Sequence, residues 1–119
     1  MRRAEGRLLR RHVDGILEKN PDDRLIVYGD FNDTRSSNTG KIVVGSYNDP
    51  NYLTAIPAAD STGTRWTHWW ALHDIYSRID FVTVSHAMKP ETDFEGSRIL
   101  DDPEWETASD HRPILAIFK

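Results

Sequence analysis

One amphipathic segment near the N-terminus most constrains the fold of this chain. Apolar residues recur there at four-residue spacing, with His12 among them, so they share one stripe of a helix: Leu8, Leu9, His12, Val13, Ile16 and Leu17. Pro21 biases Asn20 out of helical geometry, so the pattern predicts a helix over about residues 2–19, with His12 at the core or its boundary. Strand-like runs follow, which favours an α/β or α+β layer.

Five later segments have the composition of strands. The first, residues 24–28, is a short apolar run closed by Gly29, which places Asp30 just past its C-terminal end. The others span residues 64–70, 78–85, 98–100 and 113–118. Residues 31–40 are rich in turn formers and predict a loop, whereas residues 41–44 fit either a short strand or part of a helix. No linker or repeat interrupts residues 1–119, so we expect one compact unit.

The composition excludes several classes of protein. The chain has no cysteine, and therefore neither a disulfide nor a thiolate metal site. No apolar run approaches the roughly 18 residues that span a bilayer, and the N-terminus does not resemble a signal peptide. We therefore expect a soluble protein of bacterial type without a membrane partner.

Charge is unevenly distributed along the chain. The formal net charge is −4, yet residues 1–19 hold six basic residues against three acidic ones. A basic patch and a solvated helix face both fit this arrangement, and charge patterning favours the helix face. The acidic remainder disfavours a nucleic-acid substrate, which nevertheless stays open as an alternative.

Asp30 and Asn32 follow the first predicted strand. An aspartate and an asparagine two positions apart in a tight loop can face the same ligand, because the carboxylate accepts a proton or binds a hard cation while the amide donates to an anion. The simpler interpretation is an Asx-turn, in which Asp30 satisfies its own loop backbone.

Asp80 stands between Ile79 and Phe81 in an apolar strand. A charge there is costly unless it is paired, although an ordinary outward-facing residue on an alternating strand is equally consistent. The pair Asp110 and His111 precedes the last strand. A histidine beside a carboxylate favours its charged form and can donate to a phosphoryl oxygen, while the simpler interpretation is a polar turn.

The histidines at positions 68, 73 and 86 have no partner at a recognisable spacing, and the sequence assigns them no chemistry.

Three short motifs occur together and in order: Gly29-Asp30-Phe31-Asn32, Arg78-Ile79-Asp80-Phe81 and Ser109-Asp110-His111-Arg112-Pro113. In this combination the chain resembles the endonuclease/exonuclease/phosphatase superfamily, which includes pancreatic deoxyribonuclease, inositol-polyphosphate phosphatases and neutral sphingomyelinases. The resemblance covers nearly the whole chain. It implies an α/β fold, the C-terminal half of a four-layer α/β/β/α sandwich, with one mostly antiparallel or mixed sheet and an N-terminal helix on one face.

The same resemblance implies a role for each motif residue. Asp30 would orient or deprotonate the attacking water, and Asn32 would hydrogen-bond the phosphate and that nucleophile. Asp110, with Asp30, would lie at a site for Mg²⁺ or Mn²⁺. His111 would stabilise charge on the phosphoryl oxygens, and Asp80 would hydrogen-bond His111 and fix its tautomer.

The superfamily pattern has an earlier half, which supplies an Asn, a metal-binding Glu and a His or Tyr, and residues 1–24 offer no counterpart to these. We therefore expect the isolated chain to bind metal weakly. One apolar sheet face would also be left in water, which predicts either a homo-oligomer packed sheet on sheet or association with a separate N-terminal half.

Two functions follow from these motifs. The first is a metal-dependent phosphoesterase that acts on a phosphodiester or phosphomonoester of undetermined class. The alternative is a catalytically silent, truncated fragment that only folds and associates.

Overall fold

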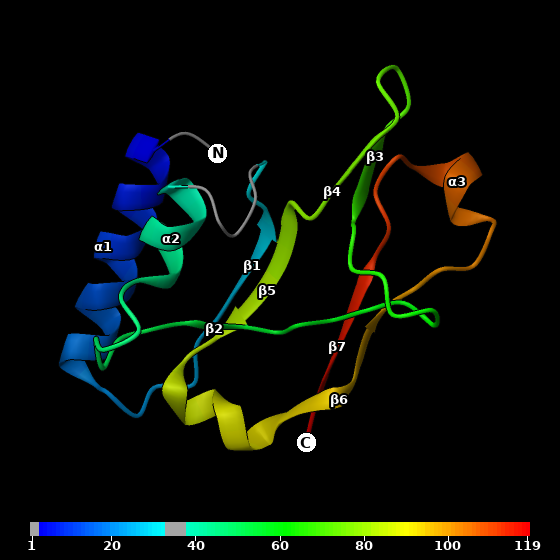
Figure 1. Ribbon diagram of the computed structural model, residues 1–119. Helices are drawn as coiled ribbons and strands as arrows, with labels where there is room; N and C mark the ends of the chain where they lie inside the picture. Colours follow the sequence, from blue (N-terminus) through cyan, green and yellow to red (C-terminus); the bar gives the residue numbers. More distant parts are fainter. Residues whose placement is uncertain (1–2, 33–37) are drawn as a thin grey trace.

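Antiparallel strand pairing organises the fold in the computed structural model, which describes residues 3–32 and 38–119 (Figure 1). The helices are α1 (Arg3–Lys19), α2 (Asn38–Val44), the 3₁₀ helix η1 (His86–Glu91) and α3 (Trp105–Ala108). The strands are β1 (Ile26–Asp30), β2 (Thr54–Ala55), β3 (His68–Trp70), β4 (Ile75–Ser77), β5 (Asp80–Val84), β6 (Thr92–Ile99) and β7 (Ile114–Phe118). The result is a small mixed α/β fold with antiparallel sheets.

Strand β5 lies at the centre, between β1 and β2. Its register with β1 is unbroken over five residue pairs, from Ile26 opposite Val84 to Asp30 opposite Asp80. Residues directly opposite each other in an antiparallel pair project from the same face. The alternation along β5 therefore separates an apolar, helix-facing set from the face that carries Asp30 and Asp80.

Helices α1 and α2 cover one face of this sheet (Figure 1). Phe31, Val43 and Phe81 form one buried cluster, and the rings of Phe31 and Phe81 stack with centroids 5.3 Å apart. The Arg10 guanidinium joins the two helices, because it donates to the carbonyls of Val43 and Val44. Burial of this face fixes which side of the strands meets the helices.

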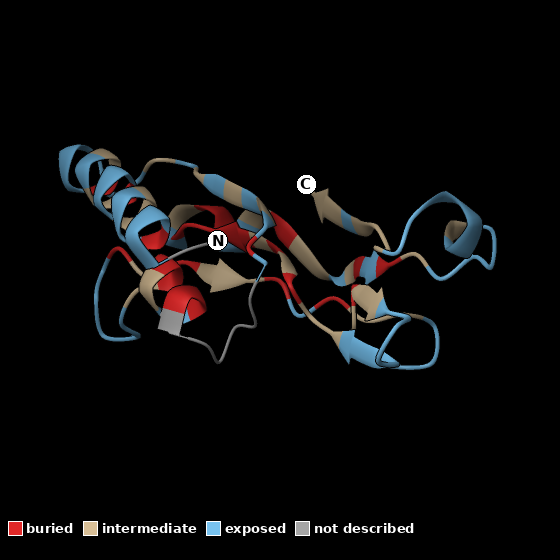
Figure 2. Ribbon diagram, turned by 90° about the horizontal axis from the view of Figure 1, so that it is seen from above, coloured by how far each residue is buried: buried red, intermediate tan, exposed pale blue. Residues whose placement is uncertain are grey.

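Strands β6 and β7 lie on the other side of the central sheet (Figures 1 and 2). A second buried cluster joins them to β5, and it consists of Ile56, Ala58, Val84, Met88 and Ile99. The cover is incomplete at β1, where Tyr28 is 75% exposed and Ile26 is 38% exposed. An apolar strip of β1 thus remains in contact with solvent.

The hairpin of β3 and β4 projects from the body of the molecule (Figure 1). At its turn, Asp74 has a positive φ of 51° and accepts a hydrogen bond from the Trp69 indole. Aromatic contacts near the base involve Trp66 and Tyr76, whose centroids are 4.8 Å apart. Leu72 at the tip is 80% exposed, so the tip is not part of the core.

Several sequence predictions are confirmed and others are wrong. Helix α1 and the strands β1, β5 and β7 occur where expected, and residues 41–44 prove to be helical. The predicted loop over residues 31–40 is wrong in part, because α2 begins at residue 38, while residues 33–37 lie outside the described part. Strand β1 continues through Asp30, β3 is shorter than predicted, and β6 is longer.

The predicted place of His12 at the core or its boundary is wrong, since His12 is exposed. Leu8 on the same helix is also 64% exposed, whereas Val13 and Leu17 are buried. The buried stripe of α1 is therefore narrower than its apolar pattern. Among the described residues, no helix combines the length and apolar character needed to cross a bilayer.

A buried ion pair between Asp60 and Arg112 joins the segment before β3 to the segment before β7. Arg112 Nη1 lies 2.8 Å from Asp60 Oδ2, and the side chains are 10% and 5% exposed for Arg112 and Asp60. Arg112 also stacks on the Trp66 ring, 3.5 Å from its centroid, and donates twice to the Trp66 carbonyl. Hydrogen bonding by Thr64 holds the pKa of Asp60 well below its ordinary range, with help from Arg112 and against the opposing effect of burial.

We predict that Arg112→Ala lowers the free energy of unfolding by roughly 3 kcal/mol, because it leaves a buried carboxylate without its cation. The exposed pair Arg24 and Glu91 supplies the control, and Arg24→Ala should cost no more than about 1 kcal/mol. Denaturant unfolding measures the free energy of unfolding of the wild type and of the two variants. The pKa of Asp60 is lowered in the folded state, so its carboxylate stabilises the fold. This stabilisation is fully present above pH 3.8, the ordinary pKa of aspartate, and is lost as the pH falls below that value. Equal losses for the two variants would contradict this account.

Candidate active site

Asp30 and Asp80 face each other at one end of the β1–β5 ladder. Like charges placed directly opposite on a sheet face repel, so this pair needs a compensating group. Gly29, just before Asp30, has a φ of 152°, a conformation that residues with a side chain rarely adopt. Gly29 nevertheless stays in β1 opposite Phe81, and Asp30 is the last residue of that strand.

The two oxygens of Asp30 have different surroundings. Oδ1 accepts a hydrogen bond of 2.7 Å from the Asn32 backbone N–H, which is the Asx-turn considered from the sequence, and Asn32 has a positive φ of 50°. Oδ2 lies 3.9 Å from His111 Nε2. The turn and the contact with His111 therefore coexist, because each uses its own oxygen.

His111 lies between the acidic groups. Its Nδ1 is 2.7 Å from Asp80 Oδ2, and its Nε2 is 3.9 Å from both Asp30 Oδ2 and Asp110 Oδ1. Partial burial lowers the pKa of His111, but the Asp80 hydrogen bond and the charges of the three carboxylates outweigh it and raise the pKa above its ordinary value. His111 is thus the group that lies between the opposed carboxylates and contacts both of them.

Backbone hydrogen bonds hold the Asp110-His111-Arg112 segment against β3. His68 and His111 form an antiparallel bridge, the Trp69 N–H donates to the Asp110 carbonyl, and the Arg112 N–H donates to the Thr67 carbonyl at 2.7 Å. The Arg112 side chain is only 10% exposed because it packs on Trp66 and pairs with Asp60, whereas the Asp110 side chain is 66% exposed.

Thr67 and Arg78 fix the start of β5 next to the site. The Thr67 hydroxyl accepts hydrogen bonds from the backbone N–H groups of Ile79 and Asp80. The Arg78 guanidinium donates to the carbonyls of Ile56, Ala58, Arg65 and Asp80. Both residues hold backbone in place, so their contribution to the site is structural.

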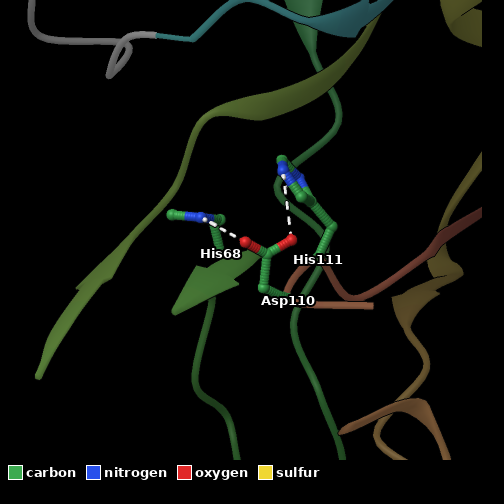
Figure 3. Close-up of side chains that lie close together, drawn as sticks. All are labelled: His68, Asp110 and His111. Carbon is green, nitrogen blue, oxygen red and sulfur yellow. Dashed lines mark hydrogen bonds and ion pairs between the residues drawn. The ribbon is translucent and has the colours of Figure 1, made fainter. Parts of the chain in front are cut away.

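His68 is a site residue that the sequence did not reveal. Its Nε2 lies 3.2 Å from Asp110 Oδ2, and its ring lies 4.8 Å from that of His111, centroid to centroid (Figure 3). No spacing rule connects position 68 with position 110. The only available signal was its place in a strand-like segment ahead of the Arg78 motif.

Two cavities meet at His111. The larger, about 530 Å³, is lined by Asp30, Asp80, Val82 and His111 and by Trp105 of α3. The smaller, about 330 Å³, is lined by Asn32, His68 and His111 together with hairpin residues. A ligand in either cavity can therefore reach the same imidazole.

The structure thus brings together Asp30, Asp80, Asp110 and His111, and Asn32 lines the smaller cavity with His111. Two overlapping groups have ligand atoms within 4.8 Å of one another, Asp30 with Asp80 and His111, and His68 with Asp110 and His111. The exposed carboxylates supply hard oxygen ligands of the kind that Mg²⁺ and Mn²⁺ prefer. The donor set therefore fits a divalent cation.

Comparison with known proteins supports the sequence resemblance. A model of the endonuclease/exonuclease/phosphatase family matches residues 1–111. This range contains the first two motifs and the third as far as His111. No curated protein and no solved structure matches the chain.

We predict that Asp80→Asn lowers the pKa of His111 relative to the wild type, because it removes the hydrogen bond and the charge that raise it. Asp30→Asn removes a charge alone and should lower the pKa less. Histidine NMR titration measures both shifts, with Asp22→Asn as a distant control. Because folding raises the pKa of His111, protonation of this residue stabilises the fold. The stabilisation is fully present below pH 6.5, the ordinary pKa of histidine, and is lost as the pH rises through the folded-state pKa. An unchanged His111 pKa in Asp80→Asn contradicts the assignment.

Proposed function

We propose, because this chain belongs to the endonuclease/exonuclease/phosphatase family, that its site hydrolyses a phosphate ester with the help of a divalent cation. Members of this family are generally hydrolases. One observation carries the proposal for this chain: His111 Nε2 lies 3.9 Å from both the Asp30 and the Asp110 carboxylates, while its Nδ1 contacts Asp80. The proposal covers phosphodiesters and phosphomonoesters alike, since both present phosphoryl oxygens.

Asp30 is the residue that we assign to the attacking water. Its side chain is 48% exposed, so water reaches it, and its Oδ1 is already fixed by the Asx-turn. The Oδ2 atom accepts a proton from the water and orients its oxygen toward the phosphorus. Asn32, two residues after Asp30, donates a hydrogen bond from its side-chain amide to the phosphate.

His111 serves as the donor to the phosphoryl group. Its Nδ1–H bond to Asp80 fixes the ring, so Nε2–H faces the centre of the site. A fixed donor stabilises the charge that accumulates on the phosphoryl oxygens in the transition state. Asp80 acts through His111 and is a positioning residue.

Asp110, with Asp30, would hold the divalent cation that the family uses, Mg²⁺ or Mn²⁺. Its side chain is exposed and carries two hard oxygens next to the imidazole that faces the phosphate. When bound there, the cation supplies positive charge that polarises the phosphoryl group and neutralises the departing oxyanion.

We also propose a four-layer α/β/β/α arrangement in which a second sheet covers the exposed strip of β1. Tyr28 is 75% exposed and Ile26 is 38% exposed on the face of β1 opposite the helices. Apolar side chains on an unpaired sheet face favour association with another sheet, either that of a second copy or that of a separate N-terminal half.

We predict that the purified chain self-associates through this strip at micromolar concentration, and that Tyr28→Asp weakens the association because it buries a charge in the interface. Light scattering measures the molar mass of the wild type and of Tyr28→Asp. Leu72→Asp is the matched control, since Leu72 is equally exposed but lies on the hairpin tip. A monomeric wild type with a cooperative thermal melt contradicts this proposal.

We predict that the folded chain hydrolyses bis(p-nitrophenyl) phosphate in Mg²⁺ or Mn²⁺, and that Asp30→Asn and His111→Gln each lower kcat by about 10²–10⁴. Loss of a general base or of a fixed donor accounts for this magnitude. Asp22→Asn, an exposed aspartate between α1 and β1, should retain wild-type turnover. A chain that is folded by circular dichroism yet shows no turnover with either ion contradicts the proposal and favours the catalytically silent module.

A further inference from the structure

His68, Asp110 and His111 form a compact cluster of nitrogen and oxygen donors beside the smaller cavity, which His68 and His111 line. Figure 3 shows the Asp110 carboxylate between the two imidazole rings. Asp110 Oδ2 lies 3.2 Å from His68 Nε2, and Asp110 Oδ1 lies 3.9 Å from His111 Nε2. All three ligand atoms lie within 4.8 Å of one another.

The backbone holds these three residues in place. The antiparallel bridge between His68 and His111 sets the two rings side by side, and the Trp69 N–H donates to the Asp110 carbonyl. His111 is further oriented by Asp80, which holds Nδ1 and leaves Nε2 toward the cluster. A carboxylate behind an imidazole in this way is the usual support of a metal-ligating histidine.

The donors lie near enough to one another to share a metal ion. Bonds of about 2.0–2.1 Å from zinc to nitrogen or oxygen place neighbouring ligands about 3.3 Å apart. The 3.2 Å from Asp110 Oδ2 to His68 Nε2 is close to that value, whereas the 3.9 Å from Asp110 Oδ1 to His111 Nε2 is longer, so binding requires the His111 and Asp110 side chains to draw together.

The donor atoms of His68, Asp110 and His111 differ from those of the Mg²⁺ or Mn²⁺ site proposed at Asp110 and Asp30. Two imidazoles and one carboxylate suit Zn²⁺ and similar borderline cations, whereas Mg²⁺ prefers oxygen donors throughout. Asp110 is 66% exposed, so a fourth position remains open to water or a ligand.

We propose that His68, Asp110 and His111 form a Zn²⁺ site that overlaps the catalytic residues, so that Zn²⁺ inhibits hydrolysis by occupying Asp110 and His111. The inhibition rests on the proposed function, but the binding does not. Bound Zn²⁺ would remove the donor from the phosphoryl group and compete with the cation held by Asp110.

Isothermal titration of ZnCl₂ into the metal-free full chain tests the binding. We expect one Zn²⁺ per chain, with affinity at least about tenfold weaker in His68→Gln, since losing even an outer partner of a metal ligand costs 10–100-fold. His12→Gln is the matched control, because His12 is exposed on α1, away from the site. Absence of binding, or equal affinity in wild type and His68→Gln, overturns the proposal.

A measurement on the wild type keeps the test independent of how His68→Gln folds. Zn²⁺ should shift the Nε2 NMR resonances of His68 and His111 and leave those of His12 and His86 in place. Shifts confined to the other histidines overturn the proposal.

Inhibition is tested separately. Zn²⁺ should suppress Mg²⁺-supported hydrolysis of bis(p-nitrophenyl) phosphate in the wild type at concentrations where binding saturates, and should do so less in His68→Gln. Undiminished hydrolysis with Zn²⁺ bound overturns the overlap. A chain that binds Zn²⁺ through His68 but hydrolyses nothing contradicts the proposed function and leaves the metal site standing.

Discussion

The antiparallel register of β1 and β5 is the constraint on which the site depends. Side chains alternate along a strand, so a slip of one residue would turn Asp30 toward the helices and send apolar residues into solvent. The buried cluster around Phe81 and Val43 prevents this slip. The acidic pair is thus held in place by apolar packing elsewhere on the same strands, and His111 lies against both carboxylates that the register brings together.

Much of this arrangement could be predicted from local sequence. The four-residue apolar spacing predicted α1, and the apolar runs predicted β1, β5 and β7, because each signal lies within a short window. Asp30 and Asp80 could be singled out only by the three motifs taken together, since each residue alone also fits an ordinary turn or strand position. The exposure of His12 could not be predicted, because the apolar stripe of a helix does not show how much of that stripe the rest of the protein will cover.

His68 shows the limit of such reasoning. It comes next to Asp110 through a bridge between segments more than forty positions apart, and nothing near position 68 encodes that contact. The strands that pair there are short, and the contact of Arg112 with Trp66 that accompanies their pairing also joins segments far apart in the sequence. Likewise, α3 and η1 carry little periodicity of their own, so they could not be recognised before the fold was known.

The β3–β4 hairpin is anchored to the rest of the molecule at its base and exposed to solvent at its tip. Thr67 ties the base to the segment before β7 and to the start of β5, whereas Leu72 extends into solvent. Hairpin residues such as Trp70 nevertheless line the cavity that His111 shares. The turn between β3 and β4 can therefore change in length and composition, by engineering or in evolution. Such a change would alter what the cavity accommodates while the reacting groups keep their positions.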